Sequence, residues 1–250
     1  SGFIPFNGVY LPLCYNTRED WRNVEFLKMW VDSYQVDTGI ANLVAPAQMN
    51  EPRVPVVQTV QALRPGLWRI GGTAVIEFAD HLTLFEAGGG PDRVREMVAL
   101  ANQIVPGKKA THLVQSHHHF DHTAGLRQAV AEGLIIISRR TNCMIYQEMT
   151  SHRAPHFPDD LEKNGKSLEC IPVDDSMVLE DGTARLELYH TINNNHTADN
   201  LFGYLPAQKT MIEADVASAA EDLQWWGDSW IDNVRHRKLD VEFNVPIHDI

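Results

Sequence analysis

The sequence predicts an α/β fold, and three stretches carry that prediction. Residues 56–85 hold short apolar runs separated by turn residues such as Pro65-Gly66, a pattern typical of antiparallel strands. Residues 92–105 place apolar side chains at helical spacing. Residues 111–133 begin as a buried strand, pass through a polar stretch and continue with helical spacing. Open α/β sheets place their sites where a strand ends and a helix begins, so the polar stretch is the first candidate site.

Composition limits the class of protein. A chain of 250 residues with 44% hydrophobic and 22% charged residues can bury one sizeable core. No apolar run reaches the roughly 18 residues that a membrane helix needs, so we expect no membrane partner. The net charge of −12 argues against a nucleic-acid partner, which requires a cationic surface. The opening Ser1-Gly2 suggests a trimmed piece of a longer protein, so compartment and oligomeric state stay open.

Residues 1–55 differ in character from the rest of the chain. They carry Trp21 and Trp30, an alternating run over 26–31, and a proline-containing exit. We interpret them as an amino-terminal extension of a few strands or a short helix, and one interpretation is a remnant of a preceding domain. They contain no histidine, so we expect no metal chemistry there. A second region of residues 56–250 is predicted to hold the site.

Within that second region the expected elements alternate between strands and helices. Strands are expected at 57–63, 66–70, 73–78, 82–85, 111–115, 134–137, 168–173, 176–179, 184–189, 209–215 and 241–247. Helices are expected at 92–105, 123–133, 141–150 and 231–239. Residues 151–166 are proline-rich and irregular, and their His152 and His156 are expected at the surface or a pocket rim.

The polar stretch at Ser116–Gly125 reads S-H-H-H-F-D-H-T-A-G and contains the pattern H-x-H-x-D-H. In extended chain, residues two apart point the same way, so His117 and His119 can bind one ion. Asp121 and His122 come after a turn and can reach a second ion. Imidazole and carboxylate ligands suit zinc, or iron or manganese where carboxylates dominate. The plain alternative is a histidine-rich surface loop.

This stretch resembles the metal motif of the metallo-β-lactamase superfamily, whose fold is an αββα sandwich with a two-metal site along one edge. The resemblance covers residues 56–250 and leaves the short extension outside the sandwich. The segment L-T-L-F-E-A-G, residues 82–88, also resembles the opening strands of that family. There, the residue after such an acidic side chain lies near the metal edge without binding the metal.

The resemblance implies three further ligands in order along the chain. His196 lies at a tight turn before a strand and matches the third ligand of the first ion. His190 could compete, but it ends a strand six residues before that turn is complete. Asp215 matches a carboxylate that bridges both ions, with an ordinary strand-end turn as its alternative and Glu213 as a weaker candidate. His248 matches the last ligand of the second ion.

The implied site therefore has two zinc ions, with iron or manganese as alternatives. His117, His119 and His196 would bind the first ion, Asp121, His122 and His248 the second, and Asp215 would bridge them. In this family a hydroxide held between the ions attacks the substrate, and Asp121 could orient it or carry its proton.

The expected reaction is hydrolysis of an ester, lactone, thioester or amide carbonyl in a small molecule. A bridging aspartate resembles hydroxyacylglutathione hydrolases, lactonases and related esterases more than the zinc β-lactamases. Alternatives are β-lactam hydrolysis, including weak promiscuous turnover, an iron-dependent dioxygenase on the same fold, or a non-catalytic protein.

Two other groups of residues are expected to be structural. Cys14, Cys143 and Cys170 are widely spaced and odd in number, so we expect small core residues rather than a disulfide framework. The aromatic cluster of Trp225, Trp226 and Trp230 is expected to fill a core, with an apolar wall over the site as the alternative.

Overall fold

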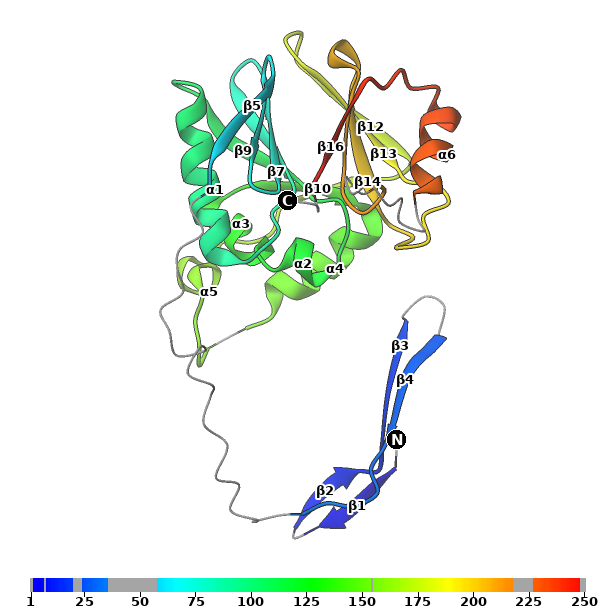
Figure 1. The fold of residues 1–250 in the computed structure, drawn as a ribbon. Helices are drawn as coiled ribbons and strands as arrows, with labels where there is room; N and C mark the ends of the chain where they lie inside the picture. The colour runs from blue at the N-terminus through cyan, green and yellow to red at the C-terminus, as the bar shows by residue number, and fades with distance from the viewer. Residues whose placement is uncertain are drawn as a thin grey trace. The chain divides into compact units, whose positions relative to one another are not determined.

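The computed structural model describes residues 2–6, 8–19, 24–35, 58–153, 155–217 and 227–247. The chain divides into two compact units, residues 1–55 and residues 56–250 (Figure 1). Within the described ranges, no helix is both long enough and apolar enough to cross a membrane.

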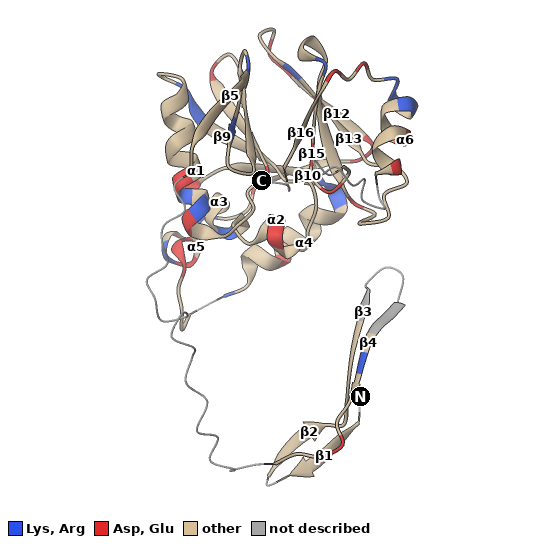
Figure 2. Ribbon diagram, in the orientation of Figure 1, with Lys and Arg blue, Asp and Glu red and all other residues tan. Residues whose placement is uncertain are grey.

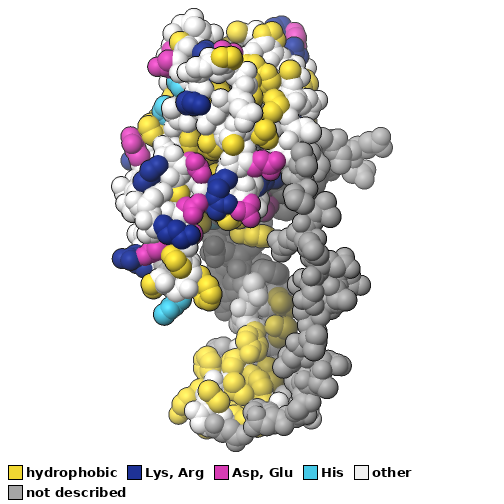
Figure 3. Space-filling view, turned by 90° about the vertical axis from the view of Figure 1, so that its left-hand side faces the viewer, with side chains coloured by type: hydrophobic (Ala, Val, Ile, Leu, Met, Phe, Trp, Pro, Cys, Tyr) yellow, Lys and Arg dark blue, Asp and Glu magenta, His cyan; other side chains and the backbone are white. Residues whose placement is uncertain are grey.

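The amino-terminal unit consists of two antiparallel hairpins. Strand β1 (Phe3–Phe6) pairs with β2 (Val9–Pro12), and β3 (Cys14–Glu19) pairs with β4 (Val24–Trp30). Of the side chains described in this unit, Cys14 alone is buried, whereas large apolar side chains such as Trp30 are exposed. In the lower part of Figure 3, hydrophobic side chains gather over this unit. Of the two expected structures for residues 1–55, strands or a short helix, the described ranges form strands.

A seven-stranded mixed sheet forms the first half of the second unit, in the order β11-β10-β9-β8-β7-β6-β5. Within this sheet, β5 to β8 pair antiparallel with their neighbours in sequence, and β9 to β11 are added in parallel. The strands are β5 (Val60–Arg64), β6 (Leu67–Ile70), β7 (Thr73–Glu77), β8 (His81–Phe85), β9 (Lys109–Val114), β10 (Ile135–Arg139) and β11 (Cys170–Val173).

A five-stranded sheet forms the second half, in the order β12-β13-β14-β15-β16. Its neighbours are antiparallel except for β15 and β16, which run parallel. The strands are β12 (Ser176–Glu180), β13 (Arg185–His190), β14 (Leu201–Leu205), β15 (Thr210–Glu213) and β16 (Phe243–Pro246), and a short 3-10 turn, η2 (Pro206–Gln208), joins β14 to β15.

Helices cover the outer faces of both sheets (Figure 1). Four of them pack against the seven-stranded sheet, namely α1 (Pro91–Ile104), α3 (Leu126–Glu132), α4 (Arg140–Ser151) and α5 (Asp160–Asn164). Helix α6 (Asp228–Arg237) packs against the five-stranded sheet. Figure 2 shows that the charged residues of this unit lie at many positions along its helices, strands and loops.

Strand alternation explains how one sheet serves two cores. In β8, Leu84 belongs to the apolar cluster under the helices, whereas the next residue, Phe85, belongs to the cluster between the sheets. Leu188 and Ile212 of the second sheet meet Phe85 in that inner cluster. The result is the αββα sandwich that the resemblance implied, and that prediction is confirmed.

The segment expected as one helix over 123–133 forms two. Helix α2 (Phe120–Thr123) begins inside the polar motif, and α3 starts only at Leu126. Gly125 separates them at a very close approach, because a Cβ there would lie 2.8 Å from the Gly88 carbonyl oxygen and 2.3 Å from Val94 Cγ2. The end of the motif therefore packs closely against the loop that follows β8, which contains Gly88.

The expectation for two of the cysteines was wrong. Cys143 of α4 and Cys170 of β11 form a disulfide, although 27 residues separate them in sequence. The Cα atoms lie 5.9 Å apart because α4 packs directly against β11, a tertiary contact that the spacing of the cysteines does not reveal. Cys14 is buried, as the sequence predicts for a small core residue.

Candidate metal centre

The polar motif leaves the seven-stranded sheet at the end of β9. The Gln115 amide donates to the Ile137 carbonyl, which continues the sheet pairing for one more residue. The Leu201 amide donates to the Ser116 carbonyl at 3.0 Å and joins the motif to the start of β14 in the second sheet. The motif therefore begins where the two sheets meet at one edge, as the sequence predicted for a site.

Six of the seven residues predicted as ligands converge at this edge. Their potential ligand atoms form overlapping sets whose members lie within 4.8 Å of one another. The sets are His117, His119, His196 and Asp215; Glu86, His117 and His122; and Asp121, His122 and Asp215. The seventh, His248, lies outside the described residues, and β16 ends two positions before it at Pro246.

Three imidazoles form one side of the cluster. His119 Nδ1 and His196 Nε2 face each other at 2.9 Å, and the His117 ring lies edge-on to both. Burial, together with the neighbouring imidazoles, lowers the pKa of His119 to about 4. Burial also lowers the pKa of His117. The rings of His117 and His119 are thus uncharged at neutral pH and can donate lone pairs to a metal.

Asp215 lies at the centre of the cluster. Its Oδ2 is 3.0 Å from His196 Nε2, 3.1 Å from His122 Nε2 and 3.4 Å from His117 Nε2. Burial would raise the pKa of this carboxyl, but the three imidazoles outweigh burial and hold the pKa far below its usual range. One carboxylate oxygen therefore touches both halves of the cluster, which is the position that a bridging ligand requires.

His122 forms the other side of the cluster with a partner that the sequence did not predict. Its Nδ1 lies 2.8 Å from Glu86 Oε2, and its Nε2 faces Asp215. Burial disfavours the charged ring, but the carboxylates of Glu86 and Asp215 outweigh that cost and raise the pKa of His122 to about 10. Without a metal, the His122 ring therefore keeps its charge at neutral pH beside these two carboxylates.

Glu86 is a buried anchor for the motif. Its carboxylate accepts from the Ser116 hydroxyl at 2.5 Å, from the Ser116 amide at 3.2 Å, and from the Gln115 side-chain amide. Ser116 Oγ in turn lies 2.9 Å from His117 Nδ1. The signal that could have identified Glu86 is an acidic residue directly after the apolar run of β8, because such a residue is buried and needs partners.

Asp121 is the most exposed member of the cluster. Its side chain is 41% exposed, and its Oδ2 lies 3.4 Å from His122 Nε2. Phe120, beside it at the start of α2, is 84% exposed. Asp121 therefore combines contact with the cluster and access to solvent, which a group that exchanges protons with a substrate needs.

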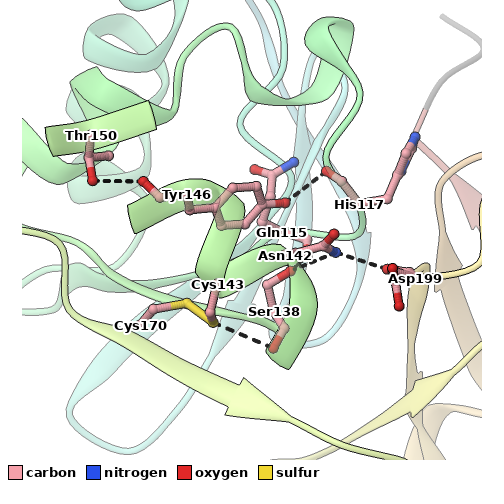
Figure 4. Close-up of a disulfide and its surroundings, with 9 residues drawn as sticks. All are labelled: Gln115, His117, Ser138, Asn142, Cys143, Tyr146, Thr150, Cys170 and Asp199. Carbon is pink, nitrogen blue, oxygen red and sulfur yellow. Dashed lines mark hydrogen bonds between the residues drawn. A yellow bond between two sulfur atoms is a disulfide. The ribbon is translucent and has the colours of Figure 1, made fainter. Parts of the chain in front are cut away.

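Helix α4 supports the motif from behind (Figure 4). The buried Tyr146 hydroxyl donates to the His117 carbonyl at 2.9 Å. Asn142 Oδ1 lies 3.2 Å from His118 Nδ1, and Asn142 Nδ2 donates to the Asp199 carbonyl at 2.9 Å. The helix thus bonds both to the motif and to the loop that carries His196, and His118 contributes no atom to the three ligand sets.

The loop before β14 positions His196 rather than His190. Asn194 Oδ1 accepts from the His196 amide at 2.7 Å, which closes a tight turn. His190 contributes no atom to the cluster, and its Nε2 bonds instead to the Ala198 carbonyl at 2.7 Å. His196, and not His190, therefore lies in the cluster.

The other residues that the sequence singled out lie elsewhere. His152 and His156 are exposed. Trp230 packs against the apolar cluster under α6, whereas Trp225 and Trp226 lie outside the described residues. Glu213 is fully buried at the end of β15 but contributes no atom to the three ligand sets. Burial raises the pKa of Glu213, while the hydrogen bonds that its carboxylate accepts act in the opposite direction.

The donor set fits a divalent metal. His117 Nε2 is buried and, among the described residues, has no hydrogen-bond partner, and Asp215 Oδ2 lies 3.4 Å from it. His119 and His196 present ring nitrogens to each other at 2.9 Å with no hydroxyl or carbonyl between them. Imidazole nitrogens around a carboxylate are the ligands that zinc and its neighbours prefer. The edge of the sandwich is therefore a candidate metal site of histidines and aspartates.

Fold and site together define a candidate metalloenzyme, and the comparisons give its family. The sequence profile of the Metallo-beta-lactamase superfamily matches residues 68–243. The chain belongs to the metallo-beta-lactamase superfamily. No curated protein matches the sequence significantly.

Solved structures show the same fold at low sequence identity. A metallo-beta-lactamase from Pontibacter korlensis is 16% identical with a TM-score of 0.59, over 76% of this chain and 90% of that chain. One from Hirschia baltica is 13% identical with a TM-score of 0.55, over 76% and 89%. One from Pseudomonas aeruginosa, in its mono-zinc form, is 15% identical with a TM-score of 0.56, over 76% and 87%. The TM-scores show a shared fold, and at these low identities they show nothing more.

Proposed function

We propose that this protein is a binuclear zinc hydrolase that cleaves an ester, lactone, thioester or amide bond in a small molecule. The observation that supports this most is the position of Asp215, whose one oxygen lies within 3.4 Å of an imidazole from each half of the cluster. In this proposal His117, His119 and His196 hold the first ion. Asp121, His122 and His248 hold the second, and Asp215 holds both.

The metals would supply an acidified water and a polarised substrate carbonyl. The protein's own groups do the remaining work. Asp121, exposed at 41%, holds or moves a proton at the mouth of the cluster. Glu86 fixes the His122 ring through Nδ1, so that Nε2 is the nitrogen presented to the cluster. Tyr146 and Ser116 keep the motif backbone and the His117 ring in place.

An ester-like substrate is favoured over a β-lactam by the carboxylate at the bridging position. A carboxylate between two cations adds negative charge, which raises the pKa of the water they share relative to a bare pair. A bridging aspartate is the pattern that resembles the esterases and lactonases of the family, so we assign the protein to that substrate class. The solved relatives are β-lactamases, so weak β-lactam turnover remains the second candidate.

A substrate panel tests the proposal. Zinc-loaded protein is assayed against lactones, aryl esters, thioesters, phosphodiesters and β-lactams, with the metal-free protein as the blank. We expect the highest kcat/KM for an ester-like class. A β-lactam that is the best substrate by a wide margin would overturn the ranking, whereas oxygen consumption with a persulfide by an iron-loaded protein would favour the dioxygenase alternative.

A further inference from the structure

The turn that carries Asp215 adopts a backbone conformation that aspartate seldom adopts. Its φ is 56°, in the left-handed region that favours glycine. The residue nevertheless must direct one oxygen at three imidazoles with distances of 3.0 to 3.4 Å. Neighbouring groups therefore have to stabilise this turn in advance.

Glu213 supplies two of the bonds that stabilise the turn. Its Oε2 accepts from the backbone amides of Val216 and Ala217, both at 3.1 Å, and these are the two amides that come directly after Asp215. The Glu213 side chain is fully buried, so water does not compete for these bonds. The direction of the Asp215 carboxylate thus depends on a carboxylate two residues earlier.

The second oxygen of Glu213 is fixed by a chain of directed hydrogen bonds. Glu213 Oε1 accepts from Asn244 Nδ2 at 2.9 Å, and Asn244 Oδ1 accepts from Trp230 Nε1 at 3.3 Å. An indole N–H can only donate, so it determines which way the Asn244 amide faces. Residue 213 must consequently accept on both of its oxygens. A carboxylate satisfies this requirement and a glutamine side chain does not.

The same residue joins the turn to the last strand. The Ile247 amide donates to the Glu213 carbonyl at 2.9 Å, and Glu213 pairs with Pro246 in the parallel register of β15 and β16. Strand β16 ends two residues before His248 in the sequence. Glu213 is therefore bonded to the Asp215 turn on one side and to the chain just before the last proposed ligand on the other.

We propose that Glu213 is a positioning residue that sets the Asp215 turn for metal binding before the metals arrive. This inference deepens the proposed function and rests on it, because it takes Asp215 as the bridging ligand. Glu213 itself contacts neither the metals nor the substrate in this proposal. It acts through the two amides after Asp215 and through Asn244.

The first test is Glu213→Gln, which places a glutamine NH2 group against the Asn244 NH2 group or against the two amides. We expect the affinity for the more weakly held zinc to fall at least about tenfold, within the range typical of outer contacts to a metal site. Zinc affinity is measured by competition with a chromophoric chelator, and site geometry by the absorption spectrum of Co2+-loaded protein. Thermal unfolding of the metal-free protein is recorded in parallel.

The double variant Glu213→Gln/Asn244→Asp supplies the rescue. The new carboxylate at position 244 accepts from the Trp230 indole and from the new glutamine NH2 group, so that the glutamine oxygen is again free for the two amides. We expect this variant to recover most of the lost zinc affinity. Tyr204→Phe is the matched control, because it removes a partly buried 2.8 Å hydrogen bond from β14 of the same sheet to the Asp240 carbonyl. It should lower the melting temperature and leave zinc affinity unchanged.

Each outcome decides the inference. Unchanged affinity for two zinc ions in Glu213→Gln overturns it. Failure of the double variant to recover zinc affinity also overturns the inference. The same criterion applies if the single variant does not fold. Loss in the single variant with recovery in the double variant supports it. Because the readout is zinc affinity, a wild-type protein that binds two zinc ions but hydrolyses no ester contradicts the proposed function alone.

Discussion

The two sheets contribute to the candidate site in different ways. The seven-stranded sheet supplies four of its residues from one stretch, His117 to His122, which follows β9 and is bonded through Ser116 to Glu86 just after β8. The five-stranded sheet supplies His196 and Asp215 one at a time, from turns at the ends of different strands. One half is a continuous motif, and the other half is assembled by the fold. The first half should therefore tolerate loss of a distant contact better than the second.

The largest effect on metal binding and activity is expected at Asp215, where the residues from the five-stranded sheet contact the motif of the seven-stranded sheet. Asp215→Asn keeps the shape of the side chain but removes the charge that faces three imidazoles. We expect one of the two metals to become labile and ester hydrolysis to fall by more than about a hundredfold, beyond the usual range for outer contacts. Metal content after dialysis and kcat/KM measure the two effects.

Asp175→Asn is the matched control for this prediction, since Asp175 forms an exposed ion pair with Arg237 away from the cluster. It should retain both metals and full activity. Two firmly held metals in Asp215→Asn would contradict the bridging role.

The next effect concerns the last proposed ligand. His248→Ala should weaken the second metal far more than the first, because His248 is proposed for the second ion only. Stepwise zinc titration separates the two affinities, and the exposed His236 provides the control His236→Ala. Equal loss of both metals, or loss of neither, would mean that the terminal match to the family is accidental.

The anchor of the continuous half gives a smaller effect. Glu86→Gln removes the carboxylate that lies 2.8 Å from His122 Nδ1, so we expect the second metal to bind about 10- to 100-fold more weakly. Glu77→Gln is the control, because Glu77 also lies at a strand end of the same sheet but pairs with Lys108 at its rim. Isothermal titration with zinc measures both variants. Equal zinc affinity in the two variants would contradict the proposed role of Glu86 in holding His122 for the second metal.

The difference between the two halves also explains what the sequence could predict. The motif H-x-H-x-D-H is local, so periodicity and ligand chemistry were sufficient to place four residues at one edge. His196 and Asp215 required the resemblance to a family, because nothing within their own stretches shows that they meet. The structure then brings them within 3.0 Å of each other.

Other contacts between distant residues were not predicted. The role of Glu86 depends on β8 lying beside β9, and the disulfide depends on α4 lying on β11. The split of the helix after the motif depends on the Gly88 carbonyl lying close to Gly125. In each case the determinant is packing between segments, which a single sequence does not display.

The smallest effect lies in the scaffold beneath the continuous half. Arg127 of α3 binds Asp159 before α5 and also donates to three backbone carbonyls, including that of Met149. The Arg127 guanidinium lowers the pKa of Asp159 in the folded protein. A lowered folded-state pKa means that this stabilisation is present above about pH 4 and is lost as acid protonates the carboxylate.

The comparison of wild type with Asp159→Asn isolates that contribution. We expect the variant to lower the free energy of unfolding by up to about 1 kcal/mol at neutral pH, since the pair is partly exposed. The difference should shrink toward zero below about pH 4. Urea unfolding of the metal-free proteins across this range measures it, and a difference that is independent of pH would contradict the ion-pair explanation.

The proposal that joins the two halves is that one edge of the sandwich holds two zinc ions. Elemental analysis of protein purified without added metal tests it most directly, because metal binding is the common role proposed for the six residues brought together there. We predict close to two zinc ions per chain, falling toward one in Asp215→Asn. A single iron without zinc would contradict this proposal and would favour the dioxygenase alternative.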